Sequence, residues 1–299
     1  MIVGFETLGE RVGYVPGGVN VGVVRGASGQ SIMIDTGVGE TNGKKALKYA
    51  REAFGSEVST IVTTHGHADH FGANQVVVKR SGAKVYAPSF DDIFLRYPVL
   101  QPTALFGGAD PLDTLRGSFL LADVSPVDAI YDVGPLEIDG VTFEVIDLCG
   151  HSPGQKGLLI DDVFFCADVV LPESVLAKYR IPYLYSVTWH LAALDRAEAT
   201  PHNVAVPGHG AITENLSLMI GENRALVLRV ADAIVEELAE PQTAEGLMTR
   251  VLDRFDAPII DAPGFYLLQP TIFAFLSHLQ RVGAVSHEID ARRSIWRRA

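Results

Sequence analysis

Residues 64–70 read Thr64-His65-Gly66-His67-Ala68-Asp69-His70, which places three imidazoles and one carboxylate within six positions. They follow an apolar, β-branched run over residues 58–64 that is typical of a buried strand. Imidazole nitrogens and carboxylate oxygens are ligands that zinc prefers. A polar, solvated loop is the ordinary alternative, but packing does not account for so many imidazoles in one turn. The stretch therefore predicts a metal site at the end of a strand.

Four ligands do not complete two metal shells, so further ligands are expected at other strand ends. His151 follows a strand-like run over residues 141–148, Asp168 follows 163–167, and His209 follows 204–206. Small residues flank each of them and permit close backbone approach. The candidate metal ligands are therefore His65, His67, Asp69, His70, His151, Asp168 and His209.

This ligand set resembles the five-part pattern of the metallo-beta-lactamase superfamily, over about residues 8–216. The resemblance implies an α/β fold, a four-layer αββα sandwich with the metals at one edge. It also implies that His65, His67 and His151 hold one metal and that Asp69, His70 and His209 hold the other. Asp168 would bridge both. Asp35 matches the family's outer carboxylate that orients the histidine loop.

The implied cofactor is two Zn²⁺, with Fe or Mn as other metals for such a site. Two zinc ions lower the pKa of a shared water to near neutral, and the resulting hydroxide can attack a carbonyl or a phosphorus. Asp69 and Asp168 are the candidate catalytic carboxylates, and the position of Asp69 suits proton transfer to the leaving group. His67 stands where the family's flavin-linked diiron branch has Glu, which disfavours that branch.

On either side of the histidine stretch, the sequence pattern predicts short strands and helices. Strands are expected over residues 11–14, 19–25, 31–35, 58–64 and 84–87, and helices over 44–54 and 74–80. Hairpins are expected around Asp139-Gly140 and Asp161-Asp162. Residues 88–128 lack a regular pattern, and such a segment usually caps a pocket or forms an interface.

Beyond about residue 216 the pattern becomes helical. Helices are predicted over residues 218–240 and 243–255, a third one opens with Pro270 in its first turn, and 284–296 reads as a hairpin. This order is typical of a winged-helix unit, so we expect a catalytic domain over 1–216 and a winged-helix domain over 217–299. The combination resembles the beta-lactamase-like protein 2 group, which includes endoribonucleases.

The same C-terminal unit leaves its role open. The hairpin has a basic tip formed by Arg292, Arg293, Arg297 and Arg298, which would suit RNA, whereas the apolar third helix suits packing or a homodimer equally well.

An irregular aromatic segment follows Asp168, where members of the family often bind substrate. The candidate substrate-binding residues are Tyr179, Tyr183, Tyr185 and His190, with core packing as the alternative. Cys149 and Cys166 each lie two residues before a predicted ligand and are expected to be small buried hydrophobes rather than a disulfide.

The composition excludes several functional classes. A net charge of -12 disfavours a protein that coats nucleic acid or an anionic membrane. The start lacks the pattern of a signal peptide, and no apolar run approaches the roughly 20 residues that span a bilayer. Two cysteines in 299 residues suit a reducing compartment, so a cytoplasmic location is expected.

The leading hypothesis is a dinuclear zinc hydrolase that attacks the carbonyl of a small ester, thioester or lactone. An RNA-cleaving phosphodiesterase is the alternative, but no insertion large enough for an RNA-clamping domain separates Asp168 from His209. An iron-dependent sulfur dioxygenase is a third reading, because that branch retains the histidine loop. A DNA-bound regulator is least favoured, since it leaves the seven filled ligand positions without a purpose.

Overall fold

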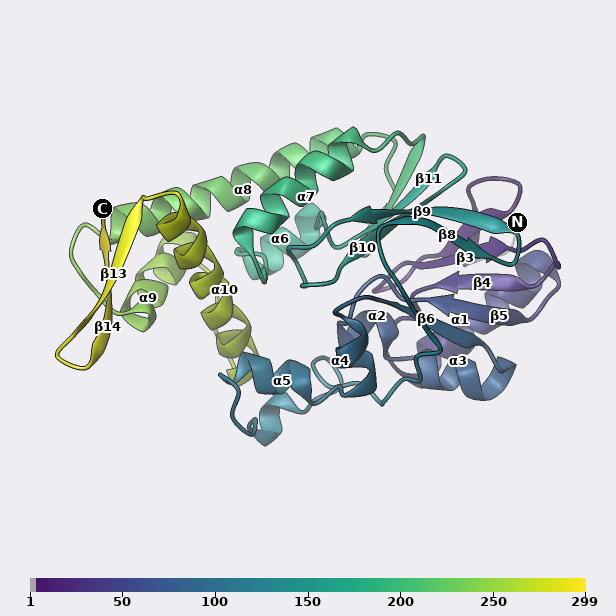
Figure 1. Cartoon of the computed structure of the whole chain (residues 1–299), viewed down its shortest axis with the longest axis horizontal. Coiled ribbons are helices and arrows are strands. Elements are labelled where there is room, and N and C mark those ends of the chain that lie inside the picture. Colours follow the sequence, from purple (N-terminus) through teal and green to yellow (C-terminus); the bar gives the residue numbers. More distant parts are fainter. Residues whose placement is uncertain (1–3) are drawn as a thin grey trace.

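The computed structural model describes residues 4–299, in which two β-sheets pack face to face with helices outside them (Figure 1). The seven-stranded sheet runs in the order β1 (Glu6–Thr7), β2 (Val12–Val15), β3 (Val21–Arg25), β4 (Ser31–Ile34), β5 (Val58–Val62), β6 (Lys84–Pro88) and β7 (Ala129–Tyr131). The five-stranded sheet runs in the order β12 (Val204–Pro207), β11 (Val163–Ala167), β10 (Lys156–Ile160), β9 (Val141–Asp147) and β8 (Gly134–Ile138).

Three apolar layers hold the sandwich together. Helices α1 (Gly39–Phe54) and α3 (Asn74–Ser81) cover the outer face of the larger sheet. The second layer lies between the sheets and contains side chains such as Phe165. The third lies outside the smaller sheet, where the preceding residue, Phe164, packs against α7 (Val187–Ala199). This alternation is the period of two that a strand buried on both faces requires. The predicted four-layer αββα sandwich is confirmed.

Local signals set several element boundaries. The hairpin between β8 and β9 turns at Asp139 and Gly140, which have φ of 48° and 68°, and positive φ at both positions suits a tight two-residue turn. Helix α1 ends before Gly55, as predicted, but begins five residues earlier than Lys44. Its first turn is exposed and polar, so it carries no apolar spacing, and the Glu40–Lys44 ion pair supports it instead.

The C-terminal elements follow the predicted order. They are α8 (Leu216–Glu237), α9 (Ala244–Phe255), α10 (Ala262–Arg281), β13 (Val285–Asp290) and β14 (Arg293–Arg298). The start predicted for the third helix is wrong, because α10 begins eight residues before Pro270. Asp261 caps it by accepting a hydrogen bond from Gly264 N, and Pro263 occupies its first turn. Pro270 lies inside the helix, where it removes one backbone hydrogen bond.

The segment over residues 88–128 contains three short helices, α4 (Asp92–Arg96), α5 (Leu100–Leu105) and η1 (Asp113–Leu115). It reaches from β6 to the C-terminal helix α10, on which α5 and η1 pack (Figure 1). Leu105 and Leu115 are buried there beside Tyr266 of α10. The segment therefore joins the sandwich to the C-terminal helices along the side that bears Tyr183.

Two further expectations can be compared with the structure. Cys149 and Cys166 are both free thiols, as predicted. Cys166 is buried as expected, whereas Cys149 is only half-buried. Within residues 4–299, none of the helices combines the length and the apolar composition that crossing a membrane requires.

Candidate metal centre

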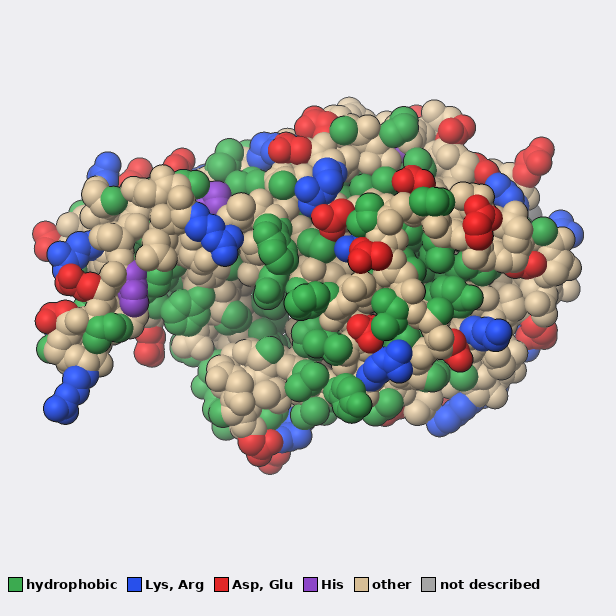
Figure 2. Space-filling model, viewed as in Figure 1, with side chains coloured by type: hydrophobic (Ala, Val, Ile, Leu, Met, Phe, Trp, Pro, Cys, Tyr) green, Lys and Arg blue, Asp and Glu red, His purple; other side chains and the backbone are tan. Residues whose placement is uncertain are grey.

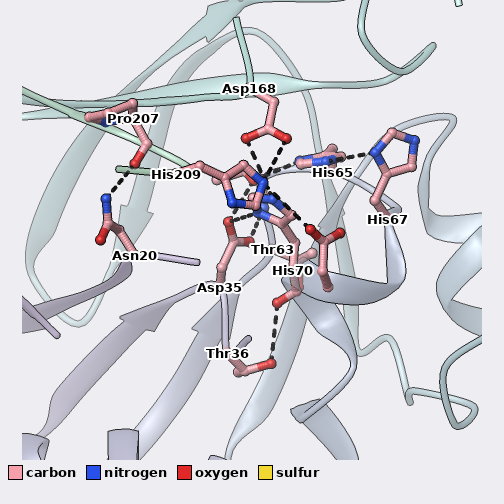
Figure 3. Close-up of polar contacts among 12 residues, drawn as sticks. Asn20, Asp35, Thr36, Thr63, His65, His67, His70, Asp168, Pro207 and His209 are labelled. Atoms are coloured by element: carbon pink, nitrogen blue, oxygen red, sulfur yellow. Dashed lines mark hydrogen bonds and ion pairs between the residues drawn. The ribbon is translucent and has the colours of Figure 1, made fainter. Parts of the chain in front are cut away.

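All seven predicted ligands converge at one edge of the sandwich, where strands from both sheets end. Figure 3 labels five of them, which are His65, His67, His70, Asp168 and His209. His65 and His67 follow β5, and the short helix α2 (Ala68–Phe71) carries Asp69 and His70. On the smaller sheet, His151 follows β9, Asp168 follows β11 and His209 follows β12. The sequence thus distributes its ligands over four strand ends that the fold brings together.

His65, His67 and His151 form the first half of the centre. His65 Nε2 lies 3.1 Å from His67 Nδ1, and His151 Nε2 lies 2.9 Å from the same atom. Burial lowers the pKa of His65 well below its ordinary value. Burial likewise lowers the pKa of His67 to about 4 and that of His151 to about 3. The three rings are therefore neutral near pH 7, and each can offer a nitrogen lone pair.

His70, Asp168, His209 and Asp69 form the second half. Asp168 Oδ1 lies 3.5 Å from His70 Nε2, and its Oδ2 lies 3.3 Å from His209 Nε2. Asp69 Oδ2 lies 3.5 Å from the same His209 nitrogen. Burial opposes charge on Asp168, but His209 and His70 outweigh it and hold the pKa of this carboxyl well below its usual range. Asp168 in turn raises the pKa of His209 to about 9.

Asp168 also connects the two halves. Its Oδ2 atom lies 3.4 Å from His151 Nε2, so one buried carboxylate faces imidazoles of both groups. Figure 3 shows it pointing toward His70 and His209, with Asp35 at the opposite end of the His70 ring. This is the position that the predicted bridging residue needs.

Four of the imidazoles are oriented by hydrogen bonds on their outward nitrogens. His70 Nδ1 bonds to Asp35 Oδ2 at 2.8 Å, and His151 Nδ1 bonds to the carbonyl of Tyr183 at 3.1 Å. His209 Nδ1 bonds to the carbonyl of Gly18, and His65 Nδ1 bonds to Thr64 Oγ1. Each oxygen accepts the Nδ1 proton, so Nε2 is the nitrogen that faces inward toward the other ligands. Metal-binding histidines are oriented in this way.

Asp35 holds the histidine loop as well as His70. Its Oδ1 accepts from Thr64 N at 2.7 Å, and its Oδ2 accepts from Thr64 Oγ1 at 2.7 Å. Because the Thr64 hydroxyl donates to Asp35, its oxygen is free to accept from His65 Nδ1. Asp35 therefore acts on imidazoles in both halves, as the outer carboxylate was expected to do.

The residues fit a divalent cation. His70 Nε2 and Asp168 Oδ1 are fully buried and lie 3.5 Å apart, yet neither makes a hydrogen bond, and an unsatisfied buried polar atom costs about 1–3 kcal/mol. Zinc–nitrogen bonds of about 2.0–2.1 Å in a tetrahedral shell separate nitrogens by roughly 3.3 Å, close to the spacings observed. Three overlapping ligand groups have donor atoms within 4.8 Å of one another. A cation bound here would accept the lone pairs of the nitrogen and oxygen atoms that make no hydrogen bond within the protein.

Glycine is required beside Asp168. A side chain at Gly208 would place its first carbon 2.0 Å from Asp168 Oδ1, so only glycine lets the His209 loop approach the bridging carboxylate.

The four predicted substrate residues occupy different places. The half-buried Tyr183 ring lies 5.6 Å from the His67 ring and 5.7 Å from the His151 ring, and burial raises the pKa of its hydroxyl to about 12. Tyr185 is exposed beside Trp189, and Tyr179 is exposed on α6 (Glu173–Tyr179). His190 is buried on α7, with its backbone against Gly150. The structure thus places only Tyr183 against the imidazoles.

Two residues that sequence reasoning missed also touch the loops of the centre. Asn20 Nδ2 donates to the carbonyls of Pro207 at 2.9 Å and Gly210 at 2.8 Å, so it holds the loop that carries His209 (Figure 3). Asp91 accepts hydrogen bonds from the loops that carry His67 and His151. Asn20 lies at the start of the strand predicted over residues 19–25, and Asp91 lies in the irregular segment, so neither sequence context indicates a role at the centre.

A small cleft opens beside the second half of the centre. Its volume is about 220 Å³, and Asp69 and His209 form part of its wall. The other lining residues are mostly apolar and include Val19 from the β2–β3 turn and Phe119 from the irregular segment, with Lys45 of α1 as a cation. A small, largely apolar group could therefore reach the metal ligands from this side.

The comparisons with known proteins agree with this geometry. The family described as the metallo-beta-lactamase superfamily matches residues 14–209, a range that includes every predicted ligand. An atrochrysone carboxyl ACP thioesterase of Passalora fulva is 22% identical over 93% of this chain and 75% of its own length. A hydroxyacylglutathione hydrolase of Haemophilus influenzae is 26% identical over 52% of this chain and 70% of its own.

The fold is also found in a solved structure. A beta-lactamase domain protein from Burkholderia ambifaria superposes with a TM-score of 0.77 at 18% identity, covering 99% of this chain and 95% of that one. The αββα sandwich, the converging histidines and aspartates, and a family match over more than half of the residues lead to one conclusion. The chain belongs to the metallo-beta-lactamase superfamily of metal-dependent hydrolases.

Proposed function

We propose that this protein is a dinuclear zinc hydrolase that cleaves a small thioester, with esters and lactones as related substrates. The observation that carries the proposal is the convergence of seven ligand side chains around the unpaired atoms His70 Nε2 and Asp168 Oδ1. Two of the relatives are named as a thioesterase and a hydroxyacylglutathione hydrolase, and those names support a thioester substrate.

The ligands divide between two ions. His65, His67 and His151 would hold one ion, Asp69, His70 and His209 the other, and Asp168 both. When bound, the ions would lower the pKa of a water molecule and polarise the carbonyl oxygen of the substrate.

The side chains around the ligands supply orientation and proton transfer. Asp35, the Tyr183 carbonyl and the Gly18 carbonyl keep the protons of three imidazoles on Nδ1, so each Nε2 remains directed inward. Asp69 is half-buried at the wall of the cleft, where its carboxylate can relay a proton from the attacking water to the departing thiolate. The cleft admits an acyl or thiol group of modest size between Val19 and Phe119.

RNA cleavage is the alternative that the C-terminal elements suggest. We assign residues 217–299 to a winged-helix unit and 1–216 to the catalytic domain, because α8–α10 and the β13–β14 hairpin follow the required order. The charges of the hairpin favour the small-molecule substrate. Arg297 pairs with Glu288, and Arg293 lies 4.0 Å from Asp290, so neighbouring carboxylates offset two of its arginines. On the face drawn in Figure 2, Lys and Arg side chains are scattered among Asp and Glu.

The test compares zinc-loaded wild type with the Asp168→Ala variant on four probes. These are a hydroxyacyl thioester of glutathione, an aryl ester, a lactone and a labelled single-stranded RNA. We expect turnover of the thioester that Asp168→Ala abolishes and that Asp162→Ala, an exposed carboxylate on the β10–β11 turn, retains.

Other outcomes would change the proposal. Retained thioester turnover in Asp168→Ala would contradict the site. RNA cleavage that the variant loses would favour the phosphodiesterase. One iron and no zinc in the active protein would favour the sulfur dioxygenase.

A further inference from the structure

Asp91 is a buried acid whose contacts differ from those that its position suggests. It immediately precedes α4, where an aspartate usually caps the helix, yet its side chain makes no capping hydrogen bond. It is fully buried, at 0% exposure. A buried carboxylate needs hydrogen-bonding partners, and those of Asp91 lie outside its own helix.

The partners of Asp91 belong to two loops that carry predicted ligands. Asp91 Oδ2 accepts from Gly66 N at 2.8 Å and from Ser152 Oγ at 2.6 Å, and Oδ1 accepts from Gly154 N at 2.7 Å. Gly66 lies between His65 and His67, and Ser152 directly follows His151. One carboxylate thus joins the two loops that bring the first three imidazoles together.

The loops are shaped to reach this carboxylate. A side chain at Gly154 would place its first carbon 2.8 Å from Asp91 Oδ1 and 2.5 Å from the Ser89 carbonyl, so a larger residue would push the loop away. A backbone bond from Lys156 N to Thr64 O, 3.0 Å long, joins the same loops at their strand ends. Asp91 acts farther along, beside the imidazoles themselves.

We propose that Asp91 is a positioning residue for the half of the metal centre formed by His65, His67 and His151. The inference rests on the proposed metal site and adds a second outer carboxylate to it. Asp35 bonds to Thr64 and His70, whereas Asp91 bonds to the His151 loop and fixes its distance from His67.

An Asn at position 91 tests this arrangement with almost no change in volume. Its amide nitrogen must face either Gly154 N or the pair formed by Gly66 N and Ser152 Oγ. Both choices set a donor against a backbone N–H, which cannot become an acceptor. A backbone hydrogen bond to one of the two loops is therefore lost in either orientation.

The experiment titrates metal-free protein with zinc and then with cobalt, whose visible spectrum reports the ligand geometry. Wild type, Asp91→Asn, Ser152→Ala and Asp92→Asn are compared, with thermal unfolding of the metal-free proteins as a check on folding. Asp92 is the matched control, because it is the adjacent acid and bonds to Arg96. We expect Asp91→Asn to bind one of two ions about 10–100-fold more weakly and to alter the cobalt spectrum, while Asp92→Asn matches wild type.

The outcomes separate the inference from the proposed function. Unchanged affinities and an unchanged cobalt spectrum in a folded Asp91→Asn protein would overturn the inference. If that variant does not fold, Ser152→Ala decides: weaker binding of one ion supports the inference, and binding equal to wild type overturns it. Wild-type protein that binds neither zinc nor cobalt would refute the proposed function itself.

Discussion

The two halves of the candidate metal centre lie side by side but are built differently. The first half consists of three imidazoles that burial keeps neutral. The second half surrounds His70 and His209 with the carboxylates of Asp168, Asp69 and Asp35. The first half therefore offers the lone pairs of buried, neutral imidazoles, whereas the second half places imidazoles beside negatively charged carboxylates.

Under the proposed dinuclear centre, this difference would let one fold hold two cations in a small volume. Three neutral ligands bring no charge to the first ion, so Asp168 and Asp69 supply the negative charge for both ions from the second half. The outer hydrogen bonds follow this division in part, because Asp35 also reaches His65 of the first half through Thr64. Asp91 joins the loops of the first half, and Asp35 bonds directly to His70 of the second.

Zinc removal should have the largest effect, because it affects both halves at once. A ligand that binds only the folded state at a thousand times its Kd stabilises it by about 4 kcal/mol. We therefore expect zinc to raise the Tm of metal-free protein markedly and expect magnesium, which disfavours imidazole ligands, to leave it unchanged. Thermal unfolding followed by circular dichroism measures this, and equal Tm values with and without zinc would contradict the site.

Removing one ligand from either half should leave one ion bound. His151→Ala is expected to lose the ion of the first half and His209→Ala the ion of the second, each with hydrolysis reduced at least about 100-fold. Metal content after equilibrium dialysis, with His202→Ala as a control outside the centre, measures the outcome. Loss of both ions in both variants would show that the halves do not bind independently.

Asp35→Asn should weaken the centre without removing a ligand, and most directly at His70 of the second half. The amide cannot accept from Thr64 N, Thr64 Oγ1 and His70 Nδ1 together, so we expect metal affinity to fall by about 10–100-fold. Asp161→Asn is a matched control, because it has a φ of 49° against 56° at Asp35 but lies on an exposed turn. Zinc titration of both variants is the measurement, and similar affinities in the two would refute the role of Asp35.

Asn20→Ala should have the smallest effect on the centre. It leaves the carbonyls of Pro207 and Gly210 without their side-chain donor, at a cost of about 1–3 kcal/mol in the free energy of unfolding. The backbone bond from Asn20 N to Gly208 O remains, so metal affinity should fall by less than about 10-fold. Urea denaturation and zinc titration test the two parts separately. A loss of metal affinity as large as that of Asp35→Asn would contradict this ranking.

The ligands could be predicted from the sequence because their signal is local. His65, His151, Asp168 and His209 lie one to four residues beyond the ends of strands, and the ends of those strands meet at one edge. The same holds for the hairpin at Asp139-Gly140, where two residues specify the turn and therefore the register. In these places one short stretch carries enough information to define the structure.

Other features depend on contacts distant in sequence. Nothing beside Asp91 indicates that its partners lie 25 to 63 positions away, and as a residue before a short helix it is indistinguishable from a cap. At α10 two prolines compete as the start of one helix, and the Asp261 cap beside Pro263 prevails over Pro270. Substrate residues are equally hidden, because the exposure of Tyr185 and the burial of His190 follow from packing around α7.

The most direct test of the central claim is the zinc content of wild-type protein and of Asp168→Ala, determined by elemental analysis after equilibrium dialysis. Asp168 faces imidazoles of both halves, so the account predicts two zinc ions per wild-type chain and fewer than two in the variant. One zinc or none in wild type, or two retained in Asp168→Ala, would contradict a dinuclear centre bridged by this carboxylate.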